Sequence, residues 1–201
     1  MNAMRICSDL WMGVGIIWLI TSLRTKRTQE RADIVTRLMY GIPVVLAFGL
    51  LFGDYIPVDW LRSSVLPGNV FVRATGVTLT ALGTAFAVWA RFSIGQNWSS
   101  APSVKVEHEL VRSGPYAWVR HPIYSGLLLA AIGTAMALRQ TRGLLAIILL
   151  WLAFWLKSRM EERFMLKTFG QEYENYSLST GALVPRIRPA PFRPAPPSPS
   201  K

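Results

Sequence analysis

The chain has 201 residues, of which 51% are hydrophobic, and its mean hydropathy is +0.30. A soluble domain of this length is not normally so apolar. The formal net charge is +11, but Lys and Arg avoid the apolar runs and collect between them. That distribution indicates a membrane protein with basic loops and argues against a nucleic-acid partner.

Five apolar segments follow one another along the chain. They run from about residues 10–23, 38–52, 74–90, 122–138 and 143–156. Some are shorter than the roughly 20 residues of a full span, but flanking Trp, Tyr and Arg side chains can extend them at the interface. We therefore expect an all-α integral membrane protein, a bundle of about five transmembrane helices with a C-terminal helical hairpin and a cytoplasmic extension.

The basic residues between these segments predict the orientation in an inner or cell membrane. Lys and Arg gather in the first connection, the third connection and the C-terminal region, which places these parts and the site in the cytoplasm and the N-terminus outside. Arg139 and Arg142 disagree, because they lie in the turn between the fourth and fifth segments, which should be outside.

The stretch GPYAWVRHPIYSG, at the start of the fourth segment, is richer in polar groups than a membrane anchor requires. Pro122 suits the first turn of a helix and disfavours helical angles at His121. Free N–H groups of such a helix start, with Arg120, predict an attractive position for an anion such as a carboxylate. Tyr124 shares a helix face with His121. The simpler interpretation is an aromatic belt with snorkelling cations, which we favour for Trp98 and Trp118.

A second polar cluster, KSRMEERFMLKTFGQEYENY, follows the fifth segment. On its own it is typical of a solvated helix end with mixed charge. However, only RQTR joins the fourth and fifth segments, so we expect a tight antiparallel hairpin. Such a hairpin brings His121 and Tyr124 to the level of Lys157 to Glu162, which makes a candidate site at the membrane surface.

These two blocks, HELVRSGPYAWVRHPIYSG and EERFMLKTFGQEYENY, together with the preceding GQNWS, resemble the isoprenylcysteine carboxyl methyltransferase family of integral membrane enzymes. The resemblance covers about residues 94–185 and implies S-adenosyl-L-methionine as the methyl donor. It implies that the cofactor lies against His108, Glu109, Leu110, Val111, Tyr116, His121, Pro122, Ile123, Tyr124 and Glu161.

The resemblance also implies a basic residue for the acceptor, one turn before Glu161. That position is Lys157 here, where the eukaryotic pattern has Arg. We expect Arg159 to take the acceptor-orienting role instead, because a guanidinium holds a carboxylate with two hydrogen bonds. The simpler alternative is that Arg159 only balances the charge of Glu162 at a solvated helix surface.

The residues themselves are consistent with methyl transfer. A sulfonium donor is already activated, and the chain shows no Ser-His-Asp set or metal-ligand spacing. We expect a lipophilic or lipid-linked acceptor that arrives through membrane lipid. Three alternatives stay open: a phospholipid N- or thiol S-methyltransferase of the same architecture, a dinucleotide-dependent sterol-type membrane reductase, and a non-catalytic membrane partner.

The predicted organisation has three parts. Residues 1–93 form a three-helix membrane region, and residues 94–184 form the catalytic loop, hairpin and cytoplasmic helix. Residues 185–201 are rich in Pro and basic residues, and we expect them to be disordered.

Overall fold

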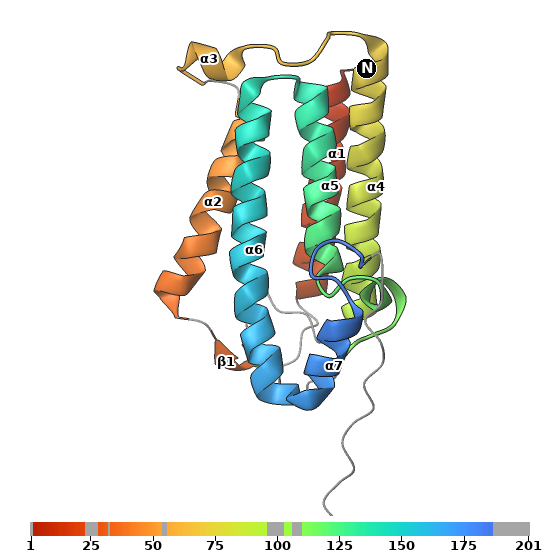
Figure 1. Ribbon diagram of the computed structural model, residues 1–201. Coiled ribbons are helices and arrows are strands. Elements are labelled where there is room, and N and C mark those ends of the chain that lie inside the picture. Colours follow the sequence, from red (N-terminus) through yellow and green to blue (C-terminus); the bar gives the residue numbers. More distant parts are fainter. Residues whose placement is uncertain are drawn as a thin grey trace, which may run out of the picture.

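A computed structural model describes residues 2–22, 28–31, 33–53, 56–95, 103–105 and 110–186, the two short segments by their backbone only. Five long helices stand side by side as a bundle (Figure 1). These helices are α1 (Ala3–Ser22), α2 (Ile34–Phe52), α4 (Val70–Ile94), α5 (Pro122–Leu138) and α6 (Thr141–Phe169). The bundle agrees with the five helices predicted from the apolar segments.

Shorter elements connect the long helices. They are β1 (Thr28–Arg31), α3 (Asp59–Arg62), β2 (Ser103–Lys105), the 3-10 helix η2 (Gly114–Ala117) and α7 (Gln171–Ser179). Strands β1 and β2 form one antiparallel pair, which the sequence analysis did not predict. Because α1, α4 and α6 run to the same end of the bundle, β1, β2, η2 and α7 lie at that end and α3 lies at the other (Figure 1). We call the end with α7 the α7 end.

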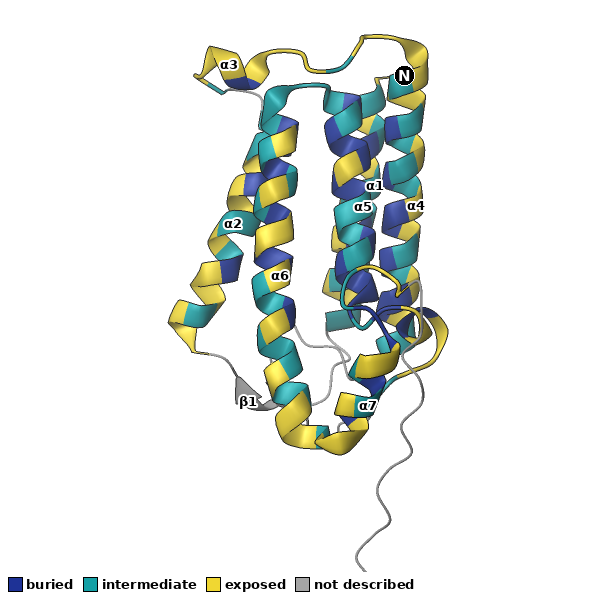
Figure 2. Ribbon diagram, in the orientation of Figure 1, coloured by how far each residue is buried: buried dark blue, intermediate teal, exposed yellow. Residues whose placement is uncertain are grey.

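Four of the helices, α1, α2, α4 and α6, are long and apolar enough to cross a membrane. The fifth, α5, is apolar but has only 17 residues, which corresponds to about 25 Å of helix. It also has more buried residues than any of the other long helices, whereas α1 and α2 carry many exposed large apolar residues (Figure 2). Outward apolar side chains are those expected on a lipid-facing surface, so α5 is the central helix of the bundle.

Glycine allows α4 and α5 to pack with their backbones in close contact. A Cβ atom on Gly83 would lie 2.3 Å from the Ala130 nitrogen, and one on Gly133 would lie 2.4 Å from the Thr80 nitrogen. Gly76 and Gly126 are equally tight against the facing backbone. In lipid, no hydrophobic effect drives two helices together, so the close packing that small residues allow is what stabilises this pair.

A buried polar cluster connects α1 to this pair of helices. The Trp11 Nε1 donates to the Thr134 hydroxyl at 3.0 Å, and the hydroxyls of Thr134 and Thr80 are 3.2 Å apart. The Cys7 sulfur lies 3.5 Å from the Thr80 oxygen. These contacts satisfy the polar groups inside an apolar bundle, and they join α1, α4 and α5 into one unit.

Helices α2 and α6 form a second packed pair (Figure 1). At the α5–α6 turn, Arg139 adopts a left-handed conformation with φ of 62°, and its carbonyl accepts from the Val65 N–H. The Arg142 Nη1 donates to the Gly53 carbonyl at 2.6 Å. Arg139 therefore connects this turn to Val65 through its backbone, whereas Arg142 connects it to the end of α2 through its guanidinium.

Two expectations from the sequence are not tested by the structure. The division into residues 1–93, 94–184 and 185–201 stays a prediction. Residues 187–201, most of the predicted disordered tail, lie outside the described residues.

Candidate active site

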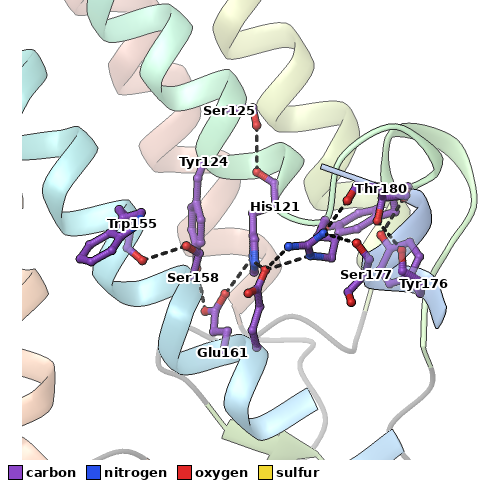
Figure 3. Close-up of polar contacts among 12 residues, drawn as sticks. His121, Tyr124, Ser125, Trp155, Ser158, Glu161, Tyr176, Ser177 and Thr180 are labelled. Atoms are coloured by element: carbon purple, nitrogen blue, oxygen red, sulfur yellow. Dashed lines mark hydrogen bonds and ion pairs between the residues drawn. The ribbon is translucent and has the colours of Figure 1, made fainter. Parts of the chain in front are cut away.

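The first turn of α5 meets the C-terminal half of α6 at the α7 end, as the hairpin predicted (Figure 3). Pro122 occupies the first helical position, where the missing N–H costs nothing. His121 precedes it with φ of −123° and ψ of 60°, outside helical angles. The restriction that Pro122 imposes thus directs the His121 side chain toward α6.

His121, Tyr124, Glu161 and Glu162 form one contact cluster between the two helices. The Tyr124 hydroxyl donates to Glu161 Oε1 at 2.6 Å, and the His121 Nδ1 lies 3.5 Å from Glu161 Oε2. The His121 Nε2 lies 3.3 Å from Glu162 Oε1. One imidazole therefore bridges two adjacent carboxylates, with its side chain only 8% exposed.

An aromatic column supports this cluster from inside the bundle. The rings of His121 and Tyr124 stack with centroids 5.5 Å apart, and those of Tyr124 and Phe154 stack at 5.0 Å. All three side chains are buried. Stacked rings restrict one another, so the polar tips of His121 and Tyr124 are held toward the carboxylates.

The sequence predicts that the helix start beside Arg120 attracts an external anion. In the structure, Arg120 and this helix start are instead bonded to groups of the chain itself. Its Nε donates to Glu162 Oε1 at 2.8 Å, and its Nη1 donates to the Ser177 carbonyl at 3.0 Å. The Arg120 and His121 N–H groups donate to the carbonyls of residues 181 and 182. The anion at this helix start is thus a carboxylate of the chain itself, and that expectation is corrected.

Residues 177–183, which follow α7, lie against the start of α5 because of these bonds. The Ser125 hydroxyl adds a 2.6 Å bond to the Leu183 carbonyl. The Tyr176 hydroxyl donates to the Tyr116 carbonyl at 2.7 Å, and burial raises the pKa of Tyr176 to about 12. Tyr176 is therefore a neutral donor that connects α7 to η2, which positions Tyr116 beside the cluster.

The two basic candidates on α6 lie in different surroundings. The Lys157 ammonium lies 5.2 Å from the centroid of the Tyr40 ring and 5.4 Å from that of Tyr124. Arg159 is exposed, and its guanidinium lies over the Trp155 ring at 5.9 Å. The structure therefore brings Lys157 to the cluster and does not bring Arg159 there.

The remaining predicted residues divide into three groups. Tyr116, Pro122 and Ile123 are buried at the α7 end beside the cluster, and Leu110 and Val111 are partly buried before η2. His108 and Glu109 lie outside the described residues. Among the described residues, no His, Cys, Asp and Glu side chains form a group of three or more that could hold a metal ion.

Glu162 was predicted to lie at the candidate site as part of a carboxylate pair, but its partners were not predicted. The structure pairs it with Arg120 and His121. Tyr40 was not singled out, although it is a buried aromatic residue at the α7 end of α2. Its only sequence signal is a Tyr near the start of an apolar helix, which is equally typical of an interfacial anchor.

Comparisons with known proteins show the family to which this chain belongs. The model of the phospholipid methyltransferase family matches residues 71–172, from the start of α4 to the start of α7. A probable protein-S-isoprenylcysteine O-methyltransferase from Oryza sativa subsp. indica is 32% identical over 155 residues, covering 76% of this chain and 81% of that relative. The chain belongs to the isoprenylcysteine carboxyl methyltransferase family.

Two further relatives of this family differ in length. The Saccharomyces cerevisiae protein-S-isoprenylcysteine O-methyltransferase is 35% identical over 115 residues, covering 56% of this chain and 48% of the relative. The solved eukaryotic intramembrane Ras methyltransferase ICMT has a TM-score of 0.53 and 24% identity, covering 78% of this chain and 53% of that one. The chain thus spans about half the length of these two proteins, and the all-α membrane fold that was predicted is confirmed.

Proposed function

We propose that this protein is an S-adenosyl-L-methionine-dependent carboxyl O-methyltransferase that acts on a lipophilic acceptor at the membrane interface. The observation that carries the proposal is the placement of Lys157 and Glu161, one helical turn apart on α6, beside His121 and Tyr124 of α5. A cation and an anion on the same face offer separate partners for an acceptor carboxylate and for the amino group of the donor.

The residues around Glu161 fit a cationic, partly aromatic donor. The Glu161 side chain is 20% exposed and lies at the edge of the cluster. The rings of Tyr124 and Tyr116 give this region an aromatic character, which favours a cation such as a sulfonium. In this proposal, Glu161 binds the donor amino group, while Tyr124 and His121 hold the Glu161 carboxylate in place.

Lys157 fits the acceptor side. Its ammonium lies where the apolar part of α6 ends, which is the depth at which a carboxylate on a lipophilic tail would lie. A positive charge at this point favours a carboxylate and disfavours an amine that is protonated at neutral pH. The lipophilic tail would remain among apolar side chains or in lipid.

The chemistry asks little of the side chains beyond orientation. When bound, the donor supplies an activated methyl group, whose C–S electron pair remains on sulfur as the carboxylate oxygen forms the new C–O bond. A carboxylate is ionised at neutral pH, so no protein group must remove a proton. The role of Lys157 and Glu161 is then to hold the two reactants in line, an entropic contribution that can be large.

A phospholipid amine is the second candidate acceptor, because the matching family model is described as phospholipid methyltransferase. An amine must lose a proton before or during transfer, and His121 is the group at the cluster that could take it. The Lys157 charge makes this acceptor the less favoured of the two.

The orientation in the membrane is also part of the proposal. Strands β1 and β2 and helix α7 lie at one end of the bundle, and most Lys and Arg residues belong to the first connection, the third connection and the region from Lys157 to the end of the chain. The positive-inside rule places this end in the cytoplasm and the N-terminus outside. A polar donor would then reach the cluster from the cytoplasm.

The test is ligand binding and methyl transfer by the purified full chain in detergent or lipid nanodiscs. We expect S-adenosylhomocysteine to bind and NADPH not to bind, and we expect a base-labile methyl ester to form on a prenylated cysteine such as N-acetyl-S-farnesylcysteine. Methylation of phosphatidylethanolamine alone would replace the carboxyl acceptor with the amine. Binding of NADPH without S-adenosylhomocysteine would overturn the proposal.

A further inference from the structure

Tyr40 connects α2 to the candidate site through Lys157. Its side chain belongs to a residue that is 8% exposed, and the Lys157 ammonium lies 5.2 Å from the centroid of its ring. Tyr124 presents a second ring to the same ammonium at 5.4 Å. The cation thus lies within attractive distance of two aromatic rings, which come from two different helices.

These two rings restrict where the ammonium can be. A lysine side chain has four rotatable carbon–carbon bonds and, without restraint, samples many positions near the membrane surface. Tyr124 is itself fixed by its hydrogen bond to Glu161 and by stacking on Phe154. Tyr40 is fixed by the packing of α2 along α6. The two rings therefore restrain the cation from independent directions of the fold.

We propose that Tyr40 is a positioning residue, which holds the Lys157 ammonium ready for the acceptor carboxylate. The inference rests on the proposed function and deepens it, because it makes α2 part of the acceptor site. Residues 71–172 carry the family match, so Tyr40 lies in a part of the chain that the match does not cover. Acceptor affinity would then depend on α2, a helix that has no residue in the proposed donor site.

The aromatic ring, and not the hydroxyl, is the part of Tyr40 that this role requires. A cation is attracted by the face of the ring, which Phe also has. Tyr40→Phe should keep acceptor binding, whereas Tyr40→Leu, which fills a similar space without a ring, should lose it. Comparison of these two variants separates the ring's attraction for the cation from simple packing between α2 and α6.

Phe48 provides a matched control on the same helix. Its ring contacts Trp11 edge-on at 4.9 Å and stacks on Phe52 at 6.0 Å, two turns of α2 away from Tyr40. Phe48→Leu therefore also removes an aromatic ring from α2, a partly buried one that contacts other aromatic rings and not the Lys157 ammonium. Any general loosening of α2 should appear in both Leu variants.

The experiment measures KM for N-acetyl-S-farnesylcysteine, kcat, the Kd of S-adenosylhomocysteine and the thermal midpoint for the full chain and these three variants. Tyr40→Leu should raise the acceptor KM by about three- to thirtyfold, the range that a partly buried cation–π contact supports. Its kcat and S-adenosylhomocysteine Kd should stay within about twofold of the parent. Tyr40→Phe should match the parent, and Phe48→Leu should change only the thermal midpoint.

Failure of this inference is distinct from failure of the proposed function. If the parent protein binds S-adenosylhomocysteine and forms the ester, but Tyr40→Leu keeps the parental KM, Tyr40 has no positioning role. Equal KM changes in Tyr40→Leu and Phe48→Leu would also overturn it in favour of packing. If Tyr40→Leu does not fold, Tyr40→Phe decides the matter. A raised KM in Tyr40→Phe would show that the ring without its hydroxyl is not sufficient, which contradicts the inference. A parent that forms no ester refutes the proposed function instead.

Discussion

The Tyr124 hydroxyl donates a 2.6 Å hydrogen bond to Glu161 Oε1 and thereby joins the first turn of α5 to α6. The acceptor is a carboxylate, and such bonds are worth about 1.5–3 kcal/mol. Because this bond orients the carboxylate that we assign to the donor, Tyr124→Phe should weaken S-adenosylhomocysteine binding by roughly ten- to hundredfold. Isothermal titration of the purified protein measures this change.

Tyr173→Phe is the control for that measurement. Tyr173 is buried on α7, where its ring meets Tyr176 edge-on. The same chemical change is made there, at a buried tyrosine on another helix. It should leave the S-adenosylhomocysteine affinity within about twofold of the parent. Equal losses in both variants would mean that Tyr124 acts through general stability and not through Glu161.

The different surroundings of Lys157 and Arg159 lead to the second prediction. Lys157→Ala should lower the efficiency of methyl transfer by about ten- to hundredfold, because a charged contact to the acceptor is lost. Cofactor affinity should be nearly unchanged. Arg159→Ala should transfer methyl groups like the parent, because its guanidinium faces Trp155 on an exposed surface. Loss of transfer in Arg159→Ala alone would restore the role expected from the sequence.

The outline of the fold could be predicted because it depends on local patterns. Pro122 and the basic pair around the RQTR turn mark the ends of α5, and the structure has the helix at the predicted residues 122–138. Helix α1 begins at Ala3, well before the predicted start at residue 10, because polar side chains in its first turns hid the helix. Helix boundaries outside the apolar runs depend on tertiary packing, which hydropathy does not describe.

The site was harder to predict where partners come from distant parts of the chain. The hairpin correctly placed Tyr124 near Glu161, because a short turn leaves few alternatives. Nothing local indicated that Glu162 would take the Arg120 charge or that Tyr40 of α2 would face Lys157. The positions of α2 relative to α6 and of residues 177–183 relative to α5 are set by non-local contacts, which spacing alone does not determine.

The close approach of α4 and α5 leads to a prediction about stability. A Cβ atom on Gly83 would lie 2.3 Å from the Ala130 nitrogen and 2.6 Å from the Gly126 carbonyl oxygen. Gly83→Ala must therefore separate the helices, and overpacking of this kind costs about 1–3 kcal/mol or more. Gly13→Ala on α1 is the control, since its Cβ atom would meet nothing within 4 Å. Thermal unfolding in detergent should show a lower midpoint for Gly83→Ala only.

The orientation is tested with reporter fusions. We expect a reporter that is active only in the cytoplasm to be active after Lys201, and one that is active only outside to be inactive there. The opposite result would mean that Arg139 and Arg142, and not the larger basic groups, mark the cytoplasmic side.

The position of His121 between two carboxylates leads to a prediction about pH. Burial lowers the pKa of His121, whereas hydrogen bonds and charges from Glu161 and Glu162 raise it, and the net result is a pKa above the ordinary value of 6.5. The folded protein therefore holds this proton more tightly than the unfolded chain does. The resulting stability is fully present below a pH of about 6.5 and is lost as pH rises through the folded-state pKa.

His121→Gln measures this contribution, because Gln keeps hydrogen-bonding groups but has no charge to gain. Thermal midpoints of the parent and the variant are compared in the same detergent between about pH 5.5 and pH 9, a range that brackets the ordinary histidine pKa. The parent should be the more stable protein at the acidic end, and its advantage should shrink as pH rises. A constant difference would indicate that His121 stays neutral in the folded protein. A difference that grows with pH would mean that burial outweighs the two carboxylates and lowers the pKa of His121.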